Sequence, residues 1–138
     1  MHPPSDAGID VGIITLEAGR LLGFYRDLLG LEPAGDVTIP GGRIFRLRHG
    51  ASLLKLFVPD QPPPEQPPAP KFLARSGLHY VTIRVGNIRP LLDACVRTGI
   101  PVLVPLVQPR PDLLAAIVAD PDGNPVELMQ TIITREET

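Results

Sequence analysis

An acidic side chain in a short apolar segment near the C-terminal end, Glu127, is the first candidate for chemistry. Residues 120–130 have the sequence DPDGNPVELMQ, whose first part is rich in the residue types of tight turns, so a turn followed by a strand is predicted. Side chains alternate between the two faces of a strand, so Glu127 points away from the face of Val126 and Leu128. Glu127 therefore lies on a solvated face or in a polar cavity, and alternation alone favours the solvated face.

A second acid, Asp10, falls within another predicted strand. Residues 9–15 (IDVGIIT) form a short segment rich in β-branched residues, which favours a strand. Alternation places Asp10 on the same face as Gly12 and Ile14. Asp10 is therefore an unexpected acid in a largely apolar strand.

Length, charge and cysteine content narrow the classes of function. The 138 residues suit one domain, or one domain made of two small similar halves. A formal net charge of −2 with scattered Lys and Arg gives no basic stripe, so nucleic acid is not expected as a partner. No apolar run approaches the roughly 18 residues of a membrane span and no signal pattern opens the sequence, so neither membrane binding nor export is expected. The single cysteine, Cys95, is predicted to be a small buried hydrophobe, which fits a reducing cytoplasm.

Hydrophobic periodicity predicts two helices, each preceded by one strand and followed by three. Apolar residues recur at three- and four-residue spacing in residues 17–29, and Gly30 is a natural stop; residues 88–98 form the second helix, closed by Gly99. The other strand candidates are residues 35–39, 43–48, 51–58, 77–85, 101–107, 113–119 and 125–132. The chain therefore has a β-α-β-β-β order twice, which is an α+β fold.

A proline-rich segment separates the two halves. Residues 59–70 contain seven prolines, which excludes regular helix or sheet pairing and favours a stiff, extended spacer over a ligand for a proline-recognising domain. The predicted organisation is a single domain over residues 1–138. It has a loose lead-in, a first module at residues 8–58, a linker at residues 59–76 and a second module at residues 77–133.

Equivalent positions in the two halves keep nearly constant offsets, as expected of a duplicated unit. Asp10 and Tyr80 lie 70 positions apart (80 − 10), and Lys55 and Glu127 lie 72 apart (127 − 55). Both predicted helices also follow their first strand at similar intervals. Two paired modules account for the sequence better than two unrelated halves.

The sequence resembles the vicinal oxygen chelate superfamily, which includes glyoxalase I, methylmalonyl-CoA epimerase, extradiol dioxygenases, fosfomycin-modifying enzymes and bleomycin resistance proteins. The likeness rests on FYRDLLGLE at residues 24–32, DPDGNPVELMQ at residues 120–130 and the duplicated pattern, and it covers about residues 8–133. It implies that each module curls into a half-barrel of mixed sheet. It also implies a concave cavity, commonly completed within a homodimer.

The resemblance also implies where a divalent metal would be held. Metal-using members supply His, Glu or Gln, His and Glu from the first and last strands of the two modules, whereas this chain has Asp10, Lys55, Tyr80 and Glu127 there. A protonated lysine has no lone pair to give, and a neutral tyrosine is a poor ligand. No conventional catalytic metal or other cofactor is therefore expected. The hypothesis is that Lys55 replaces the metal's charge by pairing with Asp10 and Glu127, and the alternative is that this pairing only closes a vestigial site.

Other polar residues near these positions leave alternatives open. A one-residue slip in register exchanges the faces of a strand, which would make His79 a fallback ligand beside Glu127. Arg46, Arg48 and Arg84 alternate on their strands. They can neutralise an anionic ligand, although a solvated row explains them equally well.

Three functions follow from this resemblance. The first is a cytoplasmic protein that binds a small molecule in its cavity without chemistry, although the absence of Trp is poor provision for stacking a large flat drug. The second is a metal-free isomerase, epimerase or lyase on a carbonyl compound, in which Tyr80 or Glu127 moves a proton and Lys55 stabilises an oxyanion. The third is a metal-dependent lyase or dioxygenase that uses His79 and Glu127. Saturable binding without turnover separates the first from the second, and bound metal separates the third from both.

Overall fold

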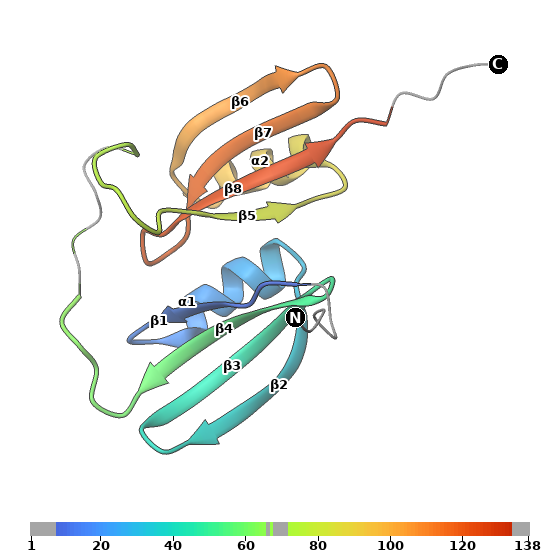
Figure 1. The fold of residues 1–138 in the computed structure, drawn as a ribbon. Coiled ribbons are helices and arrows are strands. Elements are labelled where there is room, and N and C mark those ends of the chain that lie inside the picture. Colours follow the sequence, from blue (N-terminus) through green and yellow to red (C-terminus); the bar gives the residue numbers. More distant parts are fainter. Residues whose placement is uncertain (1–7, 66, 68–71, 134–138) are drawn as a thin grey trace, which may run out of the picture. The chain divides into compact units, whose positions relative to one another are not determined.

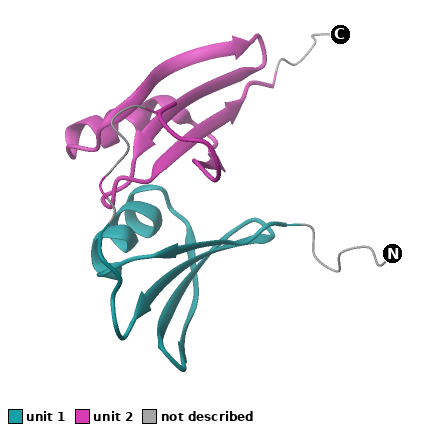
Figure 2. Ribbon diagram, turned by 60° about the vertical axis from the view of Figure 1, so that its left-hand side comes forward, with its two compact units in different colours: residues 1–66 teal, residues 67–138 magenta. Residues whose placement is uncertain are grey.

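The chain folds into two compact units of similar size, residues 1–66 and 67–138 (Figure 2). The computed structural model describes residues 8–65, 67 and 72–133. The predicted lead-in at residues 1–7 and part of the proline-rich linker lie outside the described residues. We call the two units module one and module two and describe each by itself.

Module one is a four-stranded sheet with one helical segment on a single face (Figure 1). The spatial strand order is β1-β4-β3-β2, in which β1 runs parallel to β4 and the other neighbours are antiparallel. Its elements are β1 (Val11–Ile14), α1 (Ala18–Leu22), the π-helix η1 (Gly23–Leu28), β2 (Glu32–Ile39), β3 (Gly42–His49) and β4 (Ser52–Pro59).

Module two repeats this arrangement with the order β5-β8-β7-β6, again with one parallel pair, β5 and β8 (Figure 1). Its elements are β5 (Val81–Arg84), α2 (Ile88–Arg97), β6 (Val102–Arg110), β7 (Leu113–Ala119) and β8 (Pro125–Thr131). The predicted α+β class and the two tandem βαβββ units are confirmed. Each sheet is mixed and open, and neither closes into a barrel.

The strand registers give the same two offsets as the sequence. In module one Gly12 lies opposite Lys55, and in module two Thr82 lies opposite Glu127. The first strands are thus related by 70 positions and the last strands by 72. Lys55 and Glu127 are equivalent positions of the duplicated unit.

The helices cover one face of each sheet because alternate residues of the last strand are apolar. Leu54 and Leu56 of β4 are buried with Leu21 of α1, and their module-two equivalents Val126 and Leu128 are fully buried. Burial of such side chains stabilises the fold by roughly 1.5–3 kcal/mol each. The intervening residues, including Lys55 and Glu127, point to the opposite face, which we call the open face of each module.

The helix of module one contains one residue more than its equivalent. From the helix start at Ala18 to the positive-φ glycine that follows its end, Gly30 (φ 82°), is 12 positions, whereas from Ile88 to Gly99 (φ 80°) is 11. The amide of Leu31 donates to the carbonyl of Tyr25, whereas the equivalent bond from Ile100 to Cys95 spans one residue fewer. The predicted helix at residues 17–29 is therefore an α-helix that widens into a π-helix, which absorbs the extra residue.

The predicted strand at residues 77–85 is too long, because β5 begins only at Val81. In the parallel register the position before Val81 faces Pro125, which has no N–H to donate to a ladder. Leu78 is consequently fully exposed outside the sheet. The strand predicted at residues 9–15 is likewise shortened to Val11–Ile14.

None of the helices in the described part of the chain is long and apolar enough to cross a membrane.

Candidate functional site

The structure brings together two of the four predicted site residues, Asp10 and Lys55, on the open face of module one. The Lys55 Nζ lies 3.6 Å from the Asp10 Oδ2, and the two side chains are 41% and 43% exposed. The Asp10 Oδ1 accepts a hydrogen bond of 2.9 Å from the Leu53 amide. Asp10 therefore has two tasks, because it balances the ammonium and also satisfies a backbone donor at the start of β4.

Module two lacks both partners of the hydrogen bond between Asp10 and the Leu53 amide. The position equivalent to Leu53 is Pro125, which has no amide hydrogen, and the position equivalent to Asp10 is Tyr80, which has no carboxylate. The acid and the donor are thus both present in module one and both missing in module two. Asp10 has a structural reason to be there in addition to any functional one.

The surface beside Lys55 is open. Gly12 faces Lys55 across the parallel pair, and a Cβ atom at Gly12 would meet no heavy atom within 4 Å. The ammonium of Lys55 therefore remains accessible to a small molecule.

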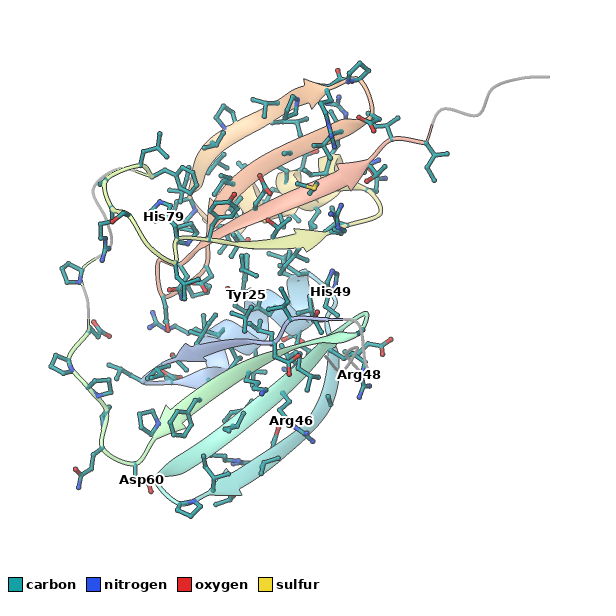
Figure 3. All side chains as sticks on the ribbon, viewed as in Figure 1. Tyr25, Arg46, Arg48, His49, Asp60 and His79 are labelled. Atoms are coloured by element: carbon teal, nitrogen blue, oxygen red, sulfur yellow. The ribbon has the colours of Figure 1, made fainter. Side chains whose placement is uncertain are left out.

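Two arginines continue the same face along β3 (Figure 3). Arg46 lies opposite Lys55 in the antiparallel register and donates to the carbonyls of Ala34 (2.7 Å) and Gly35 (3.2 Å), at the irregularity in β2. Arg48 lies opposite Leu53 and has no hydrogen bond or ion pair within the described part of the chain. Arg46 is therefore held in place by backbone acceptors, whereas the guanidinium of Arg48 is available.

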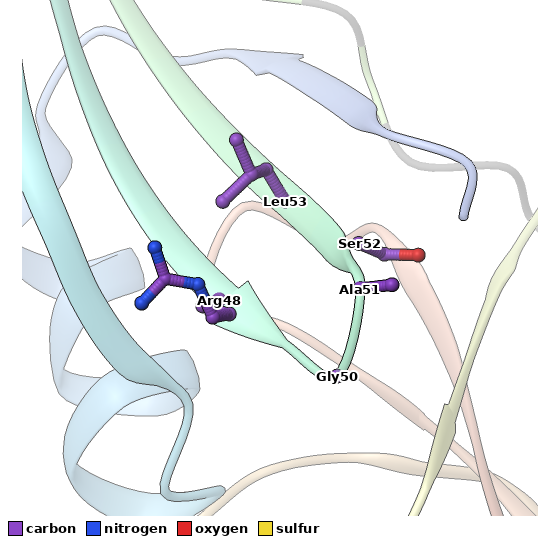
Figure 4. A pocket seen from close by; sticks show the side chains of 5 residues that line it. All are labelled: Arg48, Gly50, Ala51, Ser52 and Leu53. Atoms are coloured by element: carbon purple, nitrogen blue, oxygen red, sulfur yellow. The ribbon is translucent and has the colours of Figure 1, made fainter. Parts of the chain in front are cut away.

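Arg48 also lines a hollow of about 300 Å³ at the β3–β4 hairpin (Figure 4). The other lining residues are Gly50, Ala51, Ser52 and Leu53. The side chains of Arg48 and Leu53 lie on the same side of the hairpin. The Ser52 hydroxyl accepts a hydrogen bond of 3.1 Å from the Ile9 amide, so it is already engaged.

The other two predicted site residues, Tyr80 and Glu127, lie in module two. The hydroxyl of Thr82 donates a hydrogen bond of 2.8 Å to the Glu127 Oε1, which orients the carboxylate. Tyr80 is 52% exposed, and its ring centroid lies 5.7 Å from that of Phe72. No hydrogen bond joins Tyr80 to Glu127 among the residues that the structure describes.

His79, the fallback ligand, precedes β5 and is held by the segment that follows the linker. Its Nε2 forms a hydrogen bond with the carbonyl oxygen of Phe72, and the two rings lie 4.7 Å apart. One ring nitrogen is therefore engaged with the backbone. The role of His79 as a ligand stays a prediction.

The open face of module two differs from that of module one. Opposite Glu127 lies Ile117, which is 7% exposed, and opposite Met129 lies Ala115. Arg84 donates to the sulfur of Met129 at 3.5 Å. The positions that carry Arg46 and Arg48 in module one are occupied by Ile117 and Ala119 in module two.

The sequence interpretation missed the part played by Asp120 in the turn before β8. This side chain is 3% exposed; its Oδ1 accepts from the amides of Asp122 and Asn124, and its Oδ2 accepts from the Asn124 side chain, each at 2.9 Å. An aspartate that begins a D-x-D-G-N turn is the signal that points to this role. Asp120 therefore fixes the turn that leads into the strand of Glu127.

Cys95 is fully buried, as predicted for a small hydrophobe. Burial raises the pKa of the Cys95 thiol, because the thiolate loses its hydration. A neutral buried thiol is a poor nucleophile. Cys95 is therefore a packing residue of α2.

Within the described ranges, no three His, Cys, Asp or Glu side chains come together as a potential metal site.

The duplicated βαβββ unit places this chain in a class of proteins built from two such modules. Comparison with known proteins identifies the family. A family model described as "Glyoxalase/Bleomycin resistance protein/Dioxygenase superfamily" matches residues 10–128. The chain belongs to this superfamily.

Solved structures show the same fold at low sequence identity. A glyoxalase family protein from Bacillus cereus is 16% identical, with a TM-score of 0.77 over 96% of this chain and 99% of that one. Glyoxalase I from Leishmania major is 18% identical, with a TM-score of 0.67 over 88% and 84%. TnmS3, an antibiotic-binding protein from Streptomyces sp. CB03234, is 19% identical, with a TM-score of 0.66 over 95% and 98%. No curated protein sequence gives a significant match.

Proposed function

We propose that this protein binds a small molecule on the polar open faces of its modules and does so without a conventional catalytic metal or other cofactor. The observation that carries the proposal is the ion pair between Asp10 and Lys55 at 3.6 Å. The resemblance places metal ligands at these two positions, and here an ammonium without a lone pair occupies one of them. The other, Asp10, is engaged with that ammonium and with the Leu53 amide.

The donor set of module two supports the same conclusion. Of the two positions in module two at which the resemblance implies metal ligands, Glu127 carries an ordinary ligand, and the neutral phenol of Tyr80 is a poor partner for it. A single carboxylate and a phenol do not fit the ligand sets of divalent zinc or iron. Binding of a small molecule also agrees with TnmS3, an antibiotic-binding protein of the same fold.

A second candidate is a metal-free isomerase, epimerase or lyase acting on a carbonyl compound. Glu127 favours it, because Thr82 holds the Oε1 while the Oε2 has no hydrogen bond among the described residues. A carboxylate oriented through one oxygen can abstract a proton with the other. The expected role of Lys55 in stabilising a developing oxyanion stays a prediction.

The first test is elemental analysis of the purified, untagged protein, with thermal unfolding in added Mn, Fe, Ni, Co and Zn. We expect no stoichiometric metal and no shift in the melting temperature. Near-stoichiometric metal, or clear stabilisation by one ion, would overturn the proposal and direct attention to His79 and Glu127.

The second test separates binding from catalysis. Small molecules that stabilise the protein in a thermal screen are incubated with the wild type and with Glu127→Gln, and turnover is followed by NMR. Saturable binding without turnover supports the binding protein. Turnover that Glu127→Gln abolishes supports the enzyme instead.

We also propose that the protein is a cytoplasmic homodimer, with neither nucleic acid nor membrane as a partner, by analogy with related two-module chains that complete their cavities across a two-fold axis. Light scattering after size exclusion measures the mass directly. A mass of one chain, 14.9 kDa, at all concentrations would contradict the homodimer.

A further inference from the structure

We propose that the open face of module one binds a small organic anion, a carboxylate or phosphate on an apolar body, with Arg48 as its anchoring cation. This inference rests on the proposed function, because it names the ligand class for that binding. Three features of the molecule support it: the guanidinium of Arg48, which is unpaired among the described residues, the hollow beside it and the difference between the two modules.

Arg48 is the available cation of this face. Arg46 is fixed by two backbone carbonyls and Lys55 is paired with Asp10, whereas Arg48 has no such bond in the part of the chain that the structure describes. Its cross-strand neighbour Glu32 lies opposite in register, yet no ion pair joins the two. The five N–H donors of this guanidinium are free for a bidentate contact with a carboxylate or phosphate.

A hollow of suitable size adjoins the guanidinium. Its volume of about 300 Å³ is at the lower end of small-molecule sites, and Leu53 lies on the same side of the hairpin as Arg48 (Figure 4). An anionic group on Arg48 would leave the apolar body of the ligand against Leu53. The ammonium of Lys55, two residues further along β4, is balanced by Asp10, which leaves Arg48 as the anchor.

Module two shows that the fold itself does not require these cations. The equivalents of Arg46 and Arg48 are Ile117 and Ala119, which are buried in a sheet of the same register. Stability alone is therefore satisfied by apolar residues at both positions. Module two also has a cation on its open face, Arg84, but that guanidinium donates to the sulfur of Met129, whereas Arg48 has no such bond in the described part of the chain.

The test uses the full-length chain labelled with ¹⁵N and three probes of similar shape: phenyl phosphate, benzoate and the neutral benzyl alcohol. We expect the two anions to shift the amide signals of residues 48–53 saturably, with a Kd below about 1 mM at 0.15 M salt, whereas unspecific contacts with exposed charges do not saturate in that range. Benzyl alcohol is expected to bind far more weakly. Saturable shifts with both anions define the shared carboxylate and phosphate chemistry, and shifts with one alone narrow the class.

Matched variants assign the effect to the guanidinium. Arg48→Ala is expected to weaken anion binding about tenfold, and Arg48→Lys by less, because hydrogen bonds to charged groups are strong. Glu32→Gln is expected to strengthen binding, because it removes a nearby carboxylate that repels the anion. Arg89→Ala removes the same charge from the exposed face of α2 and is expected to leave binding unchanged. Equal weakening by Arg48→Ala and Arg89→Ala would show that net charge alone attracts the probe, and would overturn the assignment.

The outcomes also separate this subsite from the proposed function. A neutral ligand that binds at the open faces and ignores Arg48→Ala would refute the subsite and keep the function. Anion binding at residues 48–53 in a protein with stoichiometric metal would keep the subsite and refute the metal-free function. The absence of saturable shifts at residues 48–53 with either anion would overturn the subsite.

Discussion

The two modules share a backbone and differ in the chemistry of their open faces. Both have a parallel first and last strand in the same register, and both bury apolar residues under a helix. On the opposite face, module one has Lys55 paired with Asp10, whereas module two has Glu127 held by Thr82. The apolar packing under the helix is thus the same in both modules, whereas the side chains of the open face differ. Function in this chain therefore depends on the open faces and not on the fold.

The largest effect is expected from the face that the modules share. Leu56→Ala and Leu128→Ala remove equivalent, fully buried side chains, so each is expected to lower the free energy of unfolding by about 2–5 kcal/mol. Urea unfolding followed by circular dichroism measures both. Leu103→Ala, at a side chain that is 40% exposed, is the control with an expected cost below about 1 kcal/mol. A mild effect at one of the two leucines would show that the modules are not packed alike.

The next effect concerns the hairpins before the last strands, which differ between the modules. Asp120→Ala removes a buried acceptor of three hydrogen bonds and is expected to cost about 2–3 kcal/mol in the free energy of unfolding. Module one has no such acid at its hairpin, where Gly50 (φ 58°) makes the turn. Asp112→Ala, which loses only an exposed ion pair with Arg110 at 3.6 Å, is the matched control and should change stability by less than about 1 kcal/mol. Equal effects of the two variants would mean that the turn does not depend on Asp120.

A smaller effect is expected at the open face of module one. Asp10→Ala is expected to cost about 0.5–1.5 kcal/mol, because it removes the acceptor of the Leu53 amide, which is close enough to water to be partly rehydrated. Lys55→Met is expected to cost less than about 1 kcal/mol, since the ion pair is more than one-third exposed. A double-mutant cycle measures the coupling between the two side chains. A coupling of several kcal/mol would contradict a solvent-screened pair and indicate a desolvated one.

The smallest effect concerns the helix of module one. Arg26 donates to the Asp27 carboxylate at 2.7 Å, and this hydrogen bond lowers the pKa of Asp27, whereas the last turn of α2 carries Arg97 and no acid. A carboxylate whose folded pKa lies below its unfolded value stabilises the fold at higher pH and loses that contribution as the pH falls through the folded pKa. Arg26→Ala is expected to raise the pKa of Asp27 towards the ordinary value, as measured by NMR titration. An unchanged pKa would show that the hydrogen bond does not persist in solution.

The packed elements could be predicted from the sequence because their signals are local and periodic. The spacing of Leu21, Phe24 and Leu28 indicates a helix, and the offsets of 70 and 72 already identify the duplication. The strand at residues 77–85 was predicted too long, because the effect of Pro125 on its neighbour depends on a register that only the folded sheet defines.

The candidate site was less accessible to sequence reasoning. The pairing of Asp10 with Lys55 was anticipated, yet its second partner, the Leu53 amide, is a backbone group that no side-chain pattern reveals. The hollow at the hairpin was missed for the same reason, since residues 48–53 form it mainly through the path of the chain. The role of Asp120 as the hydrogen-bond acceptor of its turn could have been predicted from the turn sequence, but attention went to Glu127 instead.

The π-helix in residues 23–28 has a consequence for how the two halves are aligned. An ungapped alignment that matches the first strands runs out of phase by one residue after Tyr25, because the additional residue bulges within the helix. Substitution patterns collected across the two copies would then compare unrelated positions from Arg26 to Glu32. Deleting one residue between Gly23 and Leu28 should restore phase and convert the segment into a regular helix. The π-helix thus marks the position of a single-residue insertion or deletion between the two copies. An alignment of the internal repeats must place its gap within residues 23–28.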